Sequence, residues 1–200
     1  MEDLSYEQQA HDAGYALVCG VDEAGAGPLM GPVYAAAVIL PEKFELPGLN
    51  DSKKLTEKKR EALFDTICSQ CAAYGIGSAT EKEIDEINIL NATYLAMQRA
   101  VAALPVQPDC ALVDGNRAPD LPLEVRTIIK GDAQSASIAA ASILAKVSRD
   151  RYMLQMAEKY PQYAFEKHKG YGTKLHYERL EQYGISPIHR LSFLKKWMNR

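Results

Sequence analysis

The chain has 200 residues, of which 23 are Lys or Arg and 26 are Asp or Glu, so its formal net charge is −3. This length fits one domain, and a hydrophobic share of 47% indicates a packed core and excludes a disordered chain. A mildly acidic total would ordinarily argue against a nucleic-acid partner, but residues 1–145 carry 11 basic and 21 acidic side chains, whereas residues 146–200 carry 12 and 5. This split fits either a polyanionic partner or two solvated faces of opposite sign.

The predicted elements begin with two short apolar strands. Residues 18–21 and 33–40 are apolar runs, and the Gly/Pro-rich residues 22–32 between them predict a turn and hence a hairpin. Residues 54–71 follow with the spacing of a helix. The remaining patterns predict a strand at 74–79, a helix at 81–103 with a break near Asn88 or Asn91, strands at 111–113 and 125–129, a long helix at 134–159, and short helices at 173–183 and 190–199. We therefore expect an α/β domain with a mixed sheet and a helical C-terminal part.

Neither a membrane span nor a secretion signal is apparent. No apolar stretch reaches the ~18 residues that a membrane helix needs. The acidic start, Met1 to Leu4, lacks the basic region of a signal peptide. We therefore expect a cytoplasmic protein without membrane association, and a monomer, because no exposed apolar helix stands out.

Several residues that could carry chemistry have simpler structural explanations. The pair Cys68 and Cys71 lacks a second pair or histidines at zinc-ligand spacing, and its place late in a helical pattern favours two small apolar helix positions. Asp150 is flanked by arginines in the middle of the long helix, which favours a surface ion pair. His168 and His189 are interpreted as surface histidines.

Four carboxylates follow the ends of predicted strands. Asp22 and Glu23 end the first strand, Asp114 ends the strand at 111–113, and Asp132 closes the turn after the strand at 125–129. Functional groups of open α/β sheets gather outside the strand ends, so these side chains are expected to converge. Converging carboxylates raise one another's pKa unless cations neutralise them, and Mg²⁺ with oxygen ligands suits a site shared with phosphate. Two such ions, roughly 3.5–4 Å apart, would support metal-assisted phosphodiester hydrolysis.

Each of these residues also has a structural explanation. Asp22 and Glu23 could be turn residues, although two acids directly after an apolar strand are unusual. Asp114 precedes Gly115 and could be a turn former. Taken alone, Asp132 is better explained as the N-cap of the long helix.

The glycine-rich turn is a second candidate feature. Its pattern, Gly25-x-Gly27-x-x-x-Gly31, has neither the spacing of a dinucleotide fingerprint nor the Gly-Lys-Ser/Thr of a Walker loop. Its backbone N–H groups could form an anion-binding nest for a nucleic-acid backbone. A tight hairpin explains the glycines equally well.

Five ordered motifs resemble ribonuclease HII, a type 2 ribonuclease H, over about residues 18–193. The motifs are 20–29 (GVDEAGAGPL), 51–55 (DSKKL), 113–116 (VDGN), 130–133 (KGDA) with 137–147 (SIAAASILAKV), and 168–173 (HKGYGT). The resemblance implies an RNase H-like fold with a central five-stranded mixed β-sheet flanked by helices, plus a helical C-terminal region. It divides the chain into an N-terminal extension (1–17), a catalytic domain (18–160) and a C-terminal substrate-binding region (161–200).

The resemblance also implies an activity and a site. Members of this family hydrolyse the RNA strand of RNA–DNA hybrids and incise 5′ to single ribonucleotides in duplex DNA, leaving 5′-phosphate and 3′-hydroxyl ends. This activity would place the protein in ribonucleotide excision repair and DNA replication. The family's catalytic and metal-binding quartet matches Asp22, Glu23, Asp114 and Asp132, with Mg²⁺ or Mn²⁺ as the cofactor.

The family reads its substrate through two further motifs, and here the chain departs from the pattern. Ala26 replaces the family's central Arg between Gly25 and Gly27, whereas the family's Tyr matches Tyr171. A charge-assisted hydrogen bond of ~1.5–3 kcal/mol would be lost with the guanidinium. We therefore expect retained catalysis with weaker binding or an altered junction preference. The expected substrate-binding residues are Gly25, Ala26, Gly27, Lys53, Lys146, Lys169 and Tyr171.

Two other functions are compatible with parts of the pattern. One is a two-metal nuclease of the same fold that acts on DNA, although Tyr171 and the glycine loop would have no 2′-hydroxyl to read there. The other is a hybrid-binding protein with weakened catalysis, against which the complete acidic quartet argues.

Overall fold

A mixed five-stranded sheet forms the centre of the molecule, as expected from the sequence. The computed structural model describes residues 4–199. The strands are β1 (Val18–Ala24), β2 (Val33–Ile39), β3 (Ala73–Ala79), β4 (Cys110–Asp114) and β5 (Glu124–Ile128). Their spatial order is β3-β2-β1-β4-β5, in which β1 pairs antiparallel with β2 and parallel with β4. The predicted hairpin is therefore present, and the parallel half of the sheet carries the acidic strand ends.

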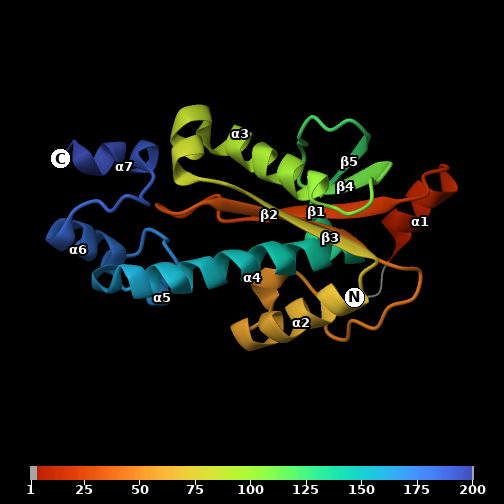
Figure 1. Ribbon diagram of the computed structural model, residues 1–200, viewed down its shortest axis with the longest axis horizontal. Coiled ribbons are helices and arrows are strands. Elements are labelled where there is room, and N and C mark those ends of the chain that lie inside the picture. Colours follow the sequence, from red (N-terminus) through yellow and green to blue (C-terminus); the bar gives the residue numbers. More distant parts are fainter. Residues whose placement is uncertain (1–3, 200) are drawn as a thin grey trace.

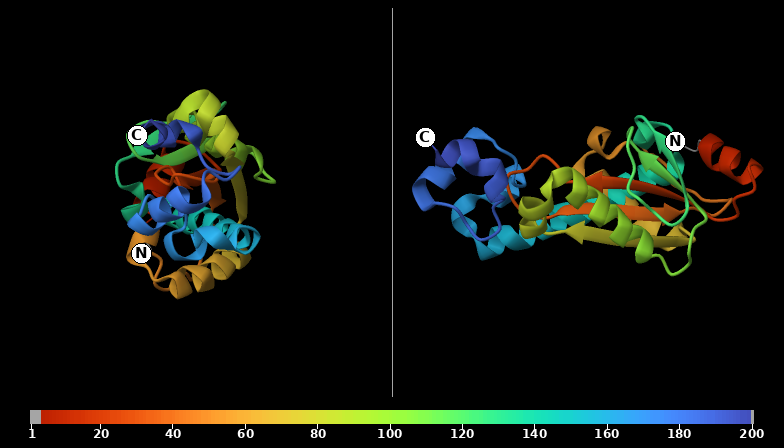
Figure 2. Two further views of the ribbon diagram at one scale, coloured as in Figure 1. Left: turned by 90° about the vertical axis from the view of Figure 1, so that its left-hand side faces the viewer. Right: turned by 90° about the horizontal axis from the view of Figure 1, so that it is seen from above.

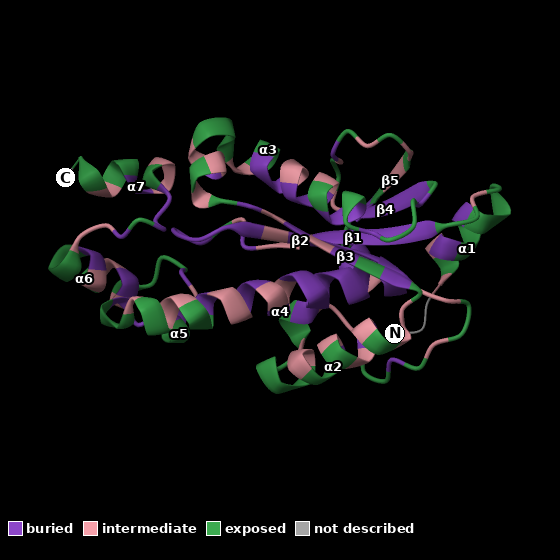
Figure 3. Ribbon diagram, in the orientation of Figure 1, coloured by how far each residue is buried: buried purple, intermediate pink, exposed green. Residues whose placement is uncertain are grey.

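Helices cover both faces of this sheet (Figures 1 and 2). The described helices longer than one turn are α1 (Ser5–Asp12), α2 (Glu57–Gln70), α3 (Glu81–Ala102), α4 (Ala136–Lys159), α6 (Lys174–Tyr183) and α7 (Leu191–Met198). The helix α3 packs on one face, against β3 and β2, and α4 packs on the other, against β1 and β2, with α2 beside it. The strands and the inner surfaces of these helices form the buried centre (Figure 3).

The contact between α4 and β1 is close because both surfaces carry small residues. Ala139, Ala140 and Ala141 of α4 are fully buried. A Cβ atom placed on Gly20 of β1 would collide with the backbone of Ser137 and Ile138. The alanine-rich segment of α4 therefore fixes the position of the strand that ends in Asp22.

Local sequence signals account for most boundaries and for one correction. Thr56 caps α2 through the N–H of Lys59, and Asn88 interrupts α3 with a φ of 69°, at one of the two expected breaks. The N-cap of α4 is Ser135, whose side chain accepts from the N–H of Ile138. The alternative that Asp132 caps this helix is therefore wrong, since that residue lies in the 3₁₀ turn Gly131–Ala133.

The C-terminal helices form a separate layer beyond the end of the sheet (Figure 1). After α4 come a 3₁₀ turn (Pro161–Tyr163), the short helix α5 (Phe165–His168), α6 and α7. The loop after β1 joins this region, because the N–H of Leu29 donates to Gly170 O at 2.8 Å and Met30 forms an isolated bridge with His189. The expected division at residues 17 and 160 stays a prediction, and its residues 1–3 and 200 lie outside the described part of the chain.

The helix α1 was not predicted, and it is joined to the centre of the molecule. It packs against β1 and β4 at the opposite end from α7. Glu7 is buried and its carboxylate accepts a hydrogen bond from the Ser135 hydroxyl at 2.6 Å and another from the Ser137 N–H at 3.0 Å. A polar helix with few apolar residues gave no strong periodic signal, which is why the sequence pattern missed it.

The structure corrects three expectations of surface residues. His168 and His189 are buried rather than exposed, and Asp150 is buried in ion pairs with Lys146 and Arg60 rather than in a surface pair. Asp150 lies where α4 meets Arg60 of α2, and the two histidines lie within the C-terminal region; local sequence shows neither contact.

The two cysteines of the Cys-x-x-Cys pattern lie at the end of a helix. Cys68 lies in the last turn of α2 and Cys71 directly after it, and both are free, half-buried thiols packed against the core. The interpretation as small apolar positions therefore agrees with their packing.

Across residues 4–199, no helix has the length and apolar character needed to cross a membrane.

Candidate active site

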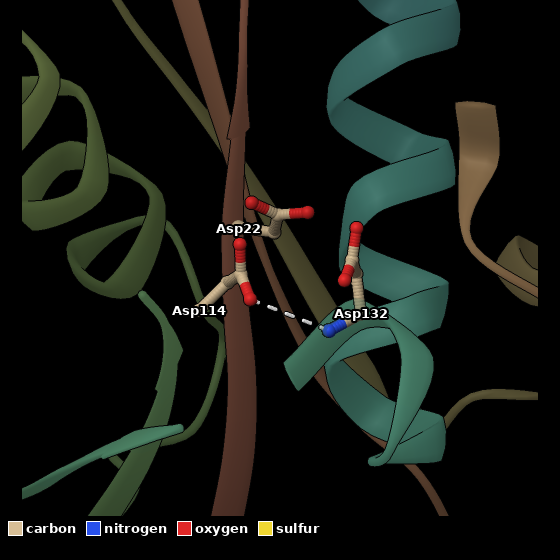
Figure 4. A group of neighbouring side chains, drawn as sticks. All are labelled: Asp22, Asp114 and Asp132. Atoms are coloured by element: carbon tan, nitrogen blue, oxygen red, sulfur yellow. Dashed lines mark hydrogen bonds between the residues drawn. The ribbon is translucent and has the colours of Figure 1, made fainter. Parts of the chain in front are cut away.

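Three aspartates from separate segments meet at the ends of the parallel strands (Figure 4). Asp22 lies near the end of β1, Asp114 ends β4, and Asp132 lies in the turn that leads from β5 to α4. Each contributes a carboxylate oxygen to a group whose atoms lie within 4.8 Å of one another. The convergence expected from the strand ends is therefore present in the structure.

Backbone geometry after β5 brings Asp132 to this group. Lys130 adopts a left-handed conformation with a φ of 56°, and the chain then turns through the 3₁₀ segment. Asp114 Oδ1 accepts hydrogen bonds from the N–H of Gly131 at 2.6 Å and from the N–H of Asp132 at 3.4 Å, the second of which is drawn in Figure 4. The Asp114 carboxylate thus holds in place the turn that carries Asp132.

The electrostatics of the site disfavour ionised carboxylates. Burial raises the pKa of Asp22 well above its ordinary value, and the charges of Glu23 and Asp114 raise it further. Burial, followed by the charge of Asp114, also raises the pKa of Asp132. The site is therefore a set of crowded carboxylates with little positive charge from the protein to neutralise them.

The donor set fits a hard divalent cation. Carboxylate oxygens are the ligands that Mg²⁺ and Mn²⁺ prefer, and a bound cation would favour the ionised form of each aspartate. Asp22, Asp114 and Asp132 are the residues that would hold such an ion in this structure.

Two other residues lie beside the three aspartates. Burial and the nearby Asp114 raise the pKa of Glu23, and the Glu23 N–H donates to Asp22 Oδ1 at 2.7 Å. Glu23 is therefore electrostatically linked to the group but does not belong to the set within 4.8 Å. Lys53, whose side chain is 80% exposed, forms an ion pair with Asp132 at 3.5 Å and leaves its ammonium accessible to solvent.

The glycine loop and Tyr171 lie next to each other at the border of the C-terminal region. A Cβ atom on Gly27 would lie 3.8 Å from the ring of Tyr171, which is an ordinary contact distance. The Tyr171 ring is 44% exposed, Gly27 is exposed, and Ala26 is half-buried. Two motifs that are about 145 positions apart in the sequence thus present one accessible surface.

The two remaining expected substrate-binding lysines are engaged in ion pairs. Lys146 contacts Asp150 at 2.7 Å, and Lys169 contacts Glu57 at 3.9 Å. Their side chains are 23% and 16% exposed. Unlike Lys53, they do not contact the three aspartates in this structure.

The fold and the acidic strand ends define the class of this protein. Two solved structures share the architecture: ribonuclease H2 from Pyrococcus horikoshii OT3 has a TM-score of 0.73 at 30% identity, covering 88% of this chain and 93% of that chain. The ribonuclease HII of Archaeoglobus fulgidus, solved in a complex with PCNA, has a TM-score of 0.70 at 27% identity over 88% of this chain and 94% of that chain. The protein is thus an enzyme of the RNase H-like fold.

Sequence comparison gives the family within that class. The family profile of ribonuclease HII matches residues 19–196. The ribonuclease HII of Caldicellulosiruptor bescii is 56% identical over 97% of this chain and 96% of its own length, and that of Vibrio campbellii is 56% identical over 90% and 85%. The chain belongs to the ribonuclease HII family and is a type 2 RNase H endoribonuclease, which confirms the resemblance.

Sequence reasoning missed three buried basic residues beside the glycine loop. Arg149, His176 and Arg190 are each 0% exposed, and they lie in or next to the helices that follow the sheet. Arginine is almost never fully buried, so the sequence alone gave no reason to place either arginine inside. His189 and Arg190 are adjacent basic residues near the end of the chain, but the local pattern does not show that they are buried.

Proposed function

We propose that this protein hydrolyses the RNA strand of RNA–DNA hybrids and incises 5′ to single ribonucleotides in duplex DNA, leaving 5′-phosphate and 3′-hydroxyl ends. The observation that carries the proposal is the meeting of Asp22, Asp114 and Asp132 at one strand edge. We assign catalysis and the binding of Mg²⁺ or Mn²⁺ to these aspartates together with Glu23. Membership of the ribonuclease HII family supports the substrate class.

The residues of the site divide the work between holding the cofactor and orienting the substrate. When bound, a divalent ion supplies the positive charge that activates water and stabilises the leaving oxygen of a phosphodiester. The aspartates provide the oxygen ligands, and the N–H of Gly131 keeps Asp114 in place. Lys53, with its exposed ammonium near Asp132, is suited to contact the phosphate that faces the site.

The glycine loop and Tyr171 are the proposed readers of the ribonucleotide. A 2′-hydroxyl can both donate and accept hydrogen bonds, and it distinguishes RNA from DNA at a single position. The amide groups at Gly25, Ala26 and Gly27 can donate to it, and the exposed Tyr171 ring can stack on the sugar or base. Because these groups are backbone amides and a Tyr, recognition survives the replacement of the family's Arg by Ala26, with weaker binding.

Basic residues outside the centre complete the proposed duplex-binding surface. We include Lys146 and Lys169, whose ion pairs with acids of this chain would be exchanged for phosphates on binding. The protein is proposed to act as a cytoplasmic monomer during ribonucleotide excision repair and DNA replication.

The decisive experiment is incubation with Mg²⁺ and three labelled duplexes of one sequence. One strand carries a single ribonucleotide, a run of ribonucleotides or only deoxyribonucleotides. We expect a single cut 5′ to the lone ribonucleotide, cleavage within the run, and no cleavage of the all-DNA duplex. Cutting of the all-DNA duplex at a similar rate would show a DNA nuclease instead, and binding without any cleavage would show a hybrid-binding protein.

A further inference from the structure

One buried side chain holds most of the carbonyl groups of the glycine loop. Arg190 is 0% exposed, and its guanidinium donates hydrogen bonds to the carbonyl oxygens of four loop residues. The acceptors and distances are Gly25 at 2.7 Å, Ala26 at 3.1 Å, Pro28 at 2.8 Å and Gly31 at 2.8 Å. The backbone N–H of Arg190 donates to Leu29 O at 2.9 Å. A single residue near the end of the chain therefore fixes five carbonyls of the loop.

A second buried arginine joins this loop to the Tyr171 segment. Arg149 of α4 is also 0% exposed and donates to Met30 O at 3.3 Å and to Lys169 O at 3.0 Å. Its guanidinium lies 5.9 Å from the centre of the Tyr171 ring. Gly25, with a φ of +97°, permits this approach, because a Cβ atom there would collide with the Arg149 side chain. Arg149 thus sets the position of both proposed readers of the ribonucleotide.

The two arginines give the loop a defined polarity. The carbonyls of residues 25, 26 and 28–31 point to the guanidinium groups or to the Arg190 N–H. By contrast, the N–H groups of Gly25, Ala26 and Gly27 have no acceptor among the residues that the structure describes. A peptide plane whose carbonyl is held inward directs the N–H of the next residue to the opposite side. The held carbonyls of Gly25 and Ala26 therefore direct the N–H groups of Ala26 and Gly27, the more exposed residues of the three, towards an electronegative ligand.

The guanidinium groups also bring positive charge close under the loop. Within residues 4–199, neither Arg149 nor Arg190 forms an ion pair with a carboxylate; carbonyl oxygens accept from their guanidinium groups instead, although the buried Nε of Arg149 has no partner among these residues. Burial and the charge of Arg149 lower the pKa of Arg190 to about 9, so it remains protonated at neutral pH. Buried charge without a counter-ion is costly, and such a cost is consistent with a local functional purpose.

We infer that Arg190 and Arg149 are positioning residues for ribonucleotide recognition, holding the carbonyls of the glycine loop inward so that its amides face the 2′-hydroxyl and the adjacent phosphate. The inference rests on the proposed function and deepens it. It also explains how the loop keeps its recognition geometry and a positive environment although Ala26 carries no charge. Lysine could not replace Arg190, because one ammonium is a point donor and the planar fork spans several carbonyls at once.

Binding measured without divalent cations tests the inference independently of catalysis. We would compare wild type, Arg190→Lys, Arg190→Met and the control Ile67→Ala, which opens a cavity at a buried position of α2 whose packed neighbours include no residue of the loop. For each protein, the ratio of Kd values for the all-DNA duplex and the duplex with one ribonucleotide gives the selectivity. Circular dichroism and thermal unfolding give the folded fraction, to which each Kd is normalised.

A positioning role and a purely structural role give different results. We expect both Arg190 variants to lose selectivity by about tenfold, the value of one hydrogen bond at the upper end of its usual range. Arg190→Lys should bind both duplexes more tightly than Arg190→Met because it keeps the charge. In steady-state cleavage the two variants should raise KM more than they lower kcat, and the Gly25 and Gly27 amide resonances should shift in the free protein. Ile67→Ala should keep the wild-type selectivity and KM.

Two failures can be told apart. Unchanged selectivity in the folded Arg190→Met protein, with wild-type Gly25 and Gly27 amide shifts, would overturn the positioning inference while the proposed function stands. If the wild type neither prefers nor cleaves the ribonucleotide duplex, the proposed function fails, and the inferred ligand of the loop fails with it.

Discussion

The molecule buries two sets of like-charged side chains and treats them in opposite ways. The aspartates at the strand ends lie within 4.8 Å of one another and have few donors, so burial and mutual repulsion raise the pKa of Asp22 and Asp132. Arg149 and Arg190 are buried more deeply, yet six backbone carbonyls accept their hydrogen bonds. The protein thus supplies most of the acceptors that the arginines need, and it leaves the charge of the aspartates to be neutralised by something it binds.

This difference separates a ligand site from an internal brace. Crowded carboxylates with only Lys53 as a positive neighbour destabilise the fold until a cation neutralises them, so we expect the arrangement to serve that ligand. Guanidinium groups that donate to several carbonyls are held rigidly, which suits the task of fixing a loop. Substitutions in the two regions should therefore change the stability of the free protein in opposite directions and by different amounts.

The largest expected effect is the loss of cleavage in Asp22→Asn. Removing one charged group from the centre of the reaction should lower the rate by about 10²- to 10³-fold or more. Without divalent cations the same variant should unfold at a temperature equal to or higher than the wild type, because an ionised Asp22 is destabilised by burial and by its acidic neighbours. Single-turnover cleavage and calorimetry measure the two effects.

Asp120→Asn is the matched control for this change. Asp120 is exposed and lies in the loop between β4 and β5, so its variant should keep both activity and unfolding temperature. Full activity of Asp22→Asn, or a clear loss of its stability, would remove the distinction between a ligand site and a structural brace.

A third buried set, the histidines of the C-terminal region, is predicted to make the fold sensitive to acid. His176 Nδ1 donates to Tyr171 O at 2.9 Å, and His176 Nε2 accepts from His189 Nε2 at 3.0 Å. The other ring nitrogen of His189, Nδ1, accepts from the Ser186 N–H at 2.9 Å. His168 stacks on His176 with ring centres 4.3 Å apart. These hydrogen bonds require the rings of His176 and His189 to be neutral, each in one particular tautomer. Protonation of either ring therefore breaks this series of hydrogen bonds.

The direction of the pH effect follows from these pKa values. Burial, chiefly, lowers the pKa of His176 and of His189 from 6.5 to about 4. The neutral forms are therefore favoured in the fold, and their contribution is complete above pH 6.5 and is lost as the pH falls towards 4. A shift of this size in one histidine corresponds to about 3 kcal/mol of unfolding free energy. The raised pKa values of Asp22 and Asp132 act in the opposite direction, since protonation on acidification relieves their repulsion.

Urea unfolding between pH 7.5 and 4.5, with histidine ring signals followed by NMR, measures this effect. We expect the rings of His176 and His189 to stay neutral in the folded protein through pH 5.5 while the stability decreases. His11→Gln, which removes an exposed histidine, should leave the pH dependence unchanged. Ring titrations with midpoints near 6.5 in the folded protein would contradict the prediction.

The sequence predicted the sheet and the acidic edge because both depend on local patterns. Apolar runs gave the five strands in order, and acids directly after strands gave the convergence of Asp22, Asp114 and Asp132. Parallel strands bring their ends to the same edge, so a local signal sufficed for a long-range contact. The assignment of roles at these positions stays a prediction that the kinetics above must test.

The burial of the basic residues could not be predicted in the same way. Arg190 is held by carbonyls more than 150 residues earlier in the chain, and backbone carbonyls carry no residue identity that a sequence pattern could reveal. His168 and His189 were expected at the surface because a sequence pattern does not show that both rings contact His176 or that nearby backbone groups pair with them. Charge and polarity at one position therefore mislead when the compensating groups are backbone atoms.

A smaller effect is expected when charge is added at the loop in Ala26→Arg. A charge-assisted hydrogen bond of about 1.5–3 kcal/mol should strengthen binding of ribonucleotide-containing duplexes by roughly 10- to 100-fold. The same change places a third positive group near Arg149 and Arg190, which have no carboxylate partner within the described residues, so the stability of the free protein should fall slightly. Ala26→Gln, a long polar side chain without charge, is the control.

The measurement for this variant compares single-ribonucleotide and long-hybrid substrates. Binding at two salt concentrations separates the added charge from other contacts, because a new phosphate contact steepens the salt dependence by close to one unit. Equal rates and affinities for Ala26→Arg and the wild type on both substrates would show that the loop does not approach the substrate at this position.

The smallest expected effect is a thermal shift caused by the cofactor, and it tests the contrast between the two buried sets most directly. At a free Mg²⁺ concentration about ten times its Kd, binding to the folded state alone adds about 1.4 kcal/mol of stability. For a chain of this length the unfolding temperature should rise by about 3–6 °C. Asp22→Asn should lose most of this shift because Asp22 is one of the expected ligands. Arg190→Met should keep the shift, because backbone carbonyls of the protein, and not the ion, are the partners of Arg190. Samples matched in ionic strength with KCl control for screening, and Mn²⁺ in place of Mg²⁺ compares the two ions at the same site. An equal shift in wild type and Asp22→Asn would mean that the ion acts elsewhere on the protein, and the raised pKa values of the aspartates would then need another explanation.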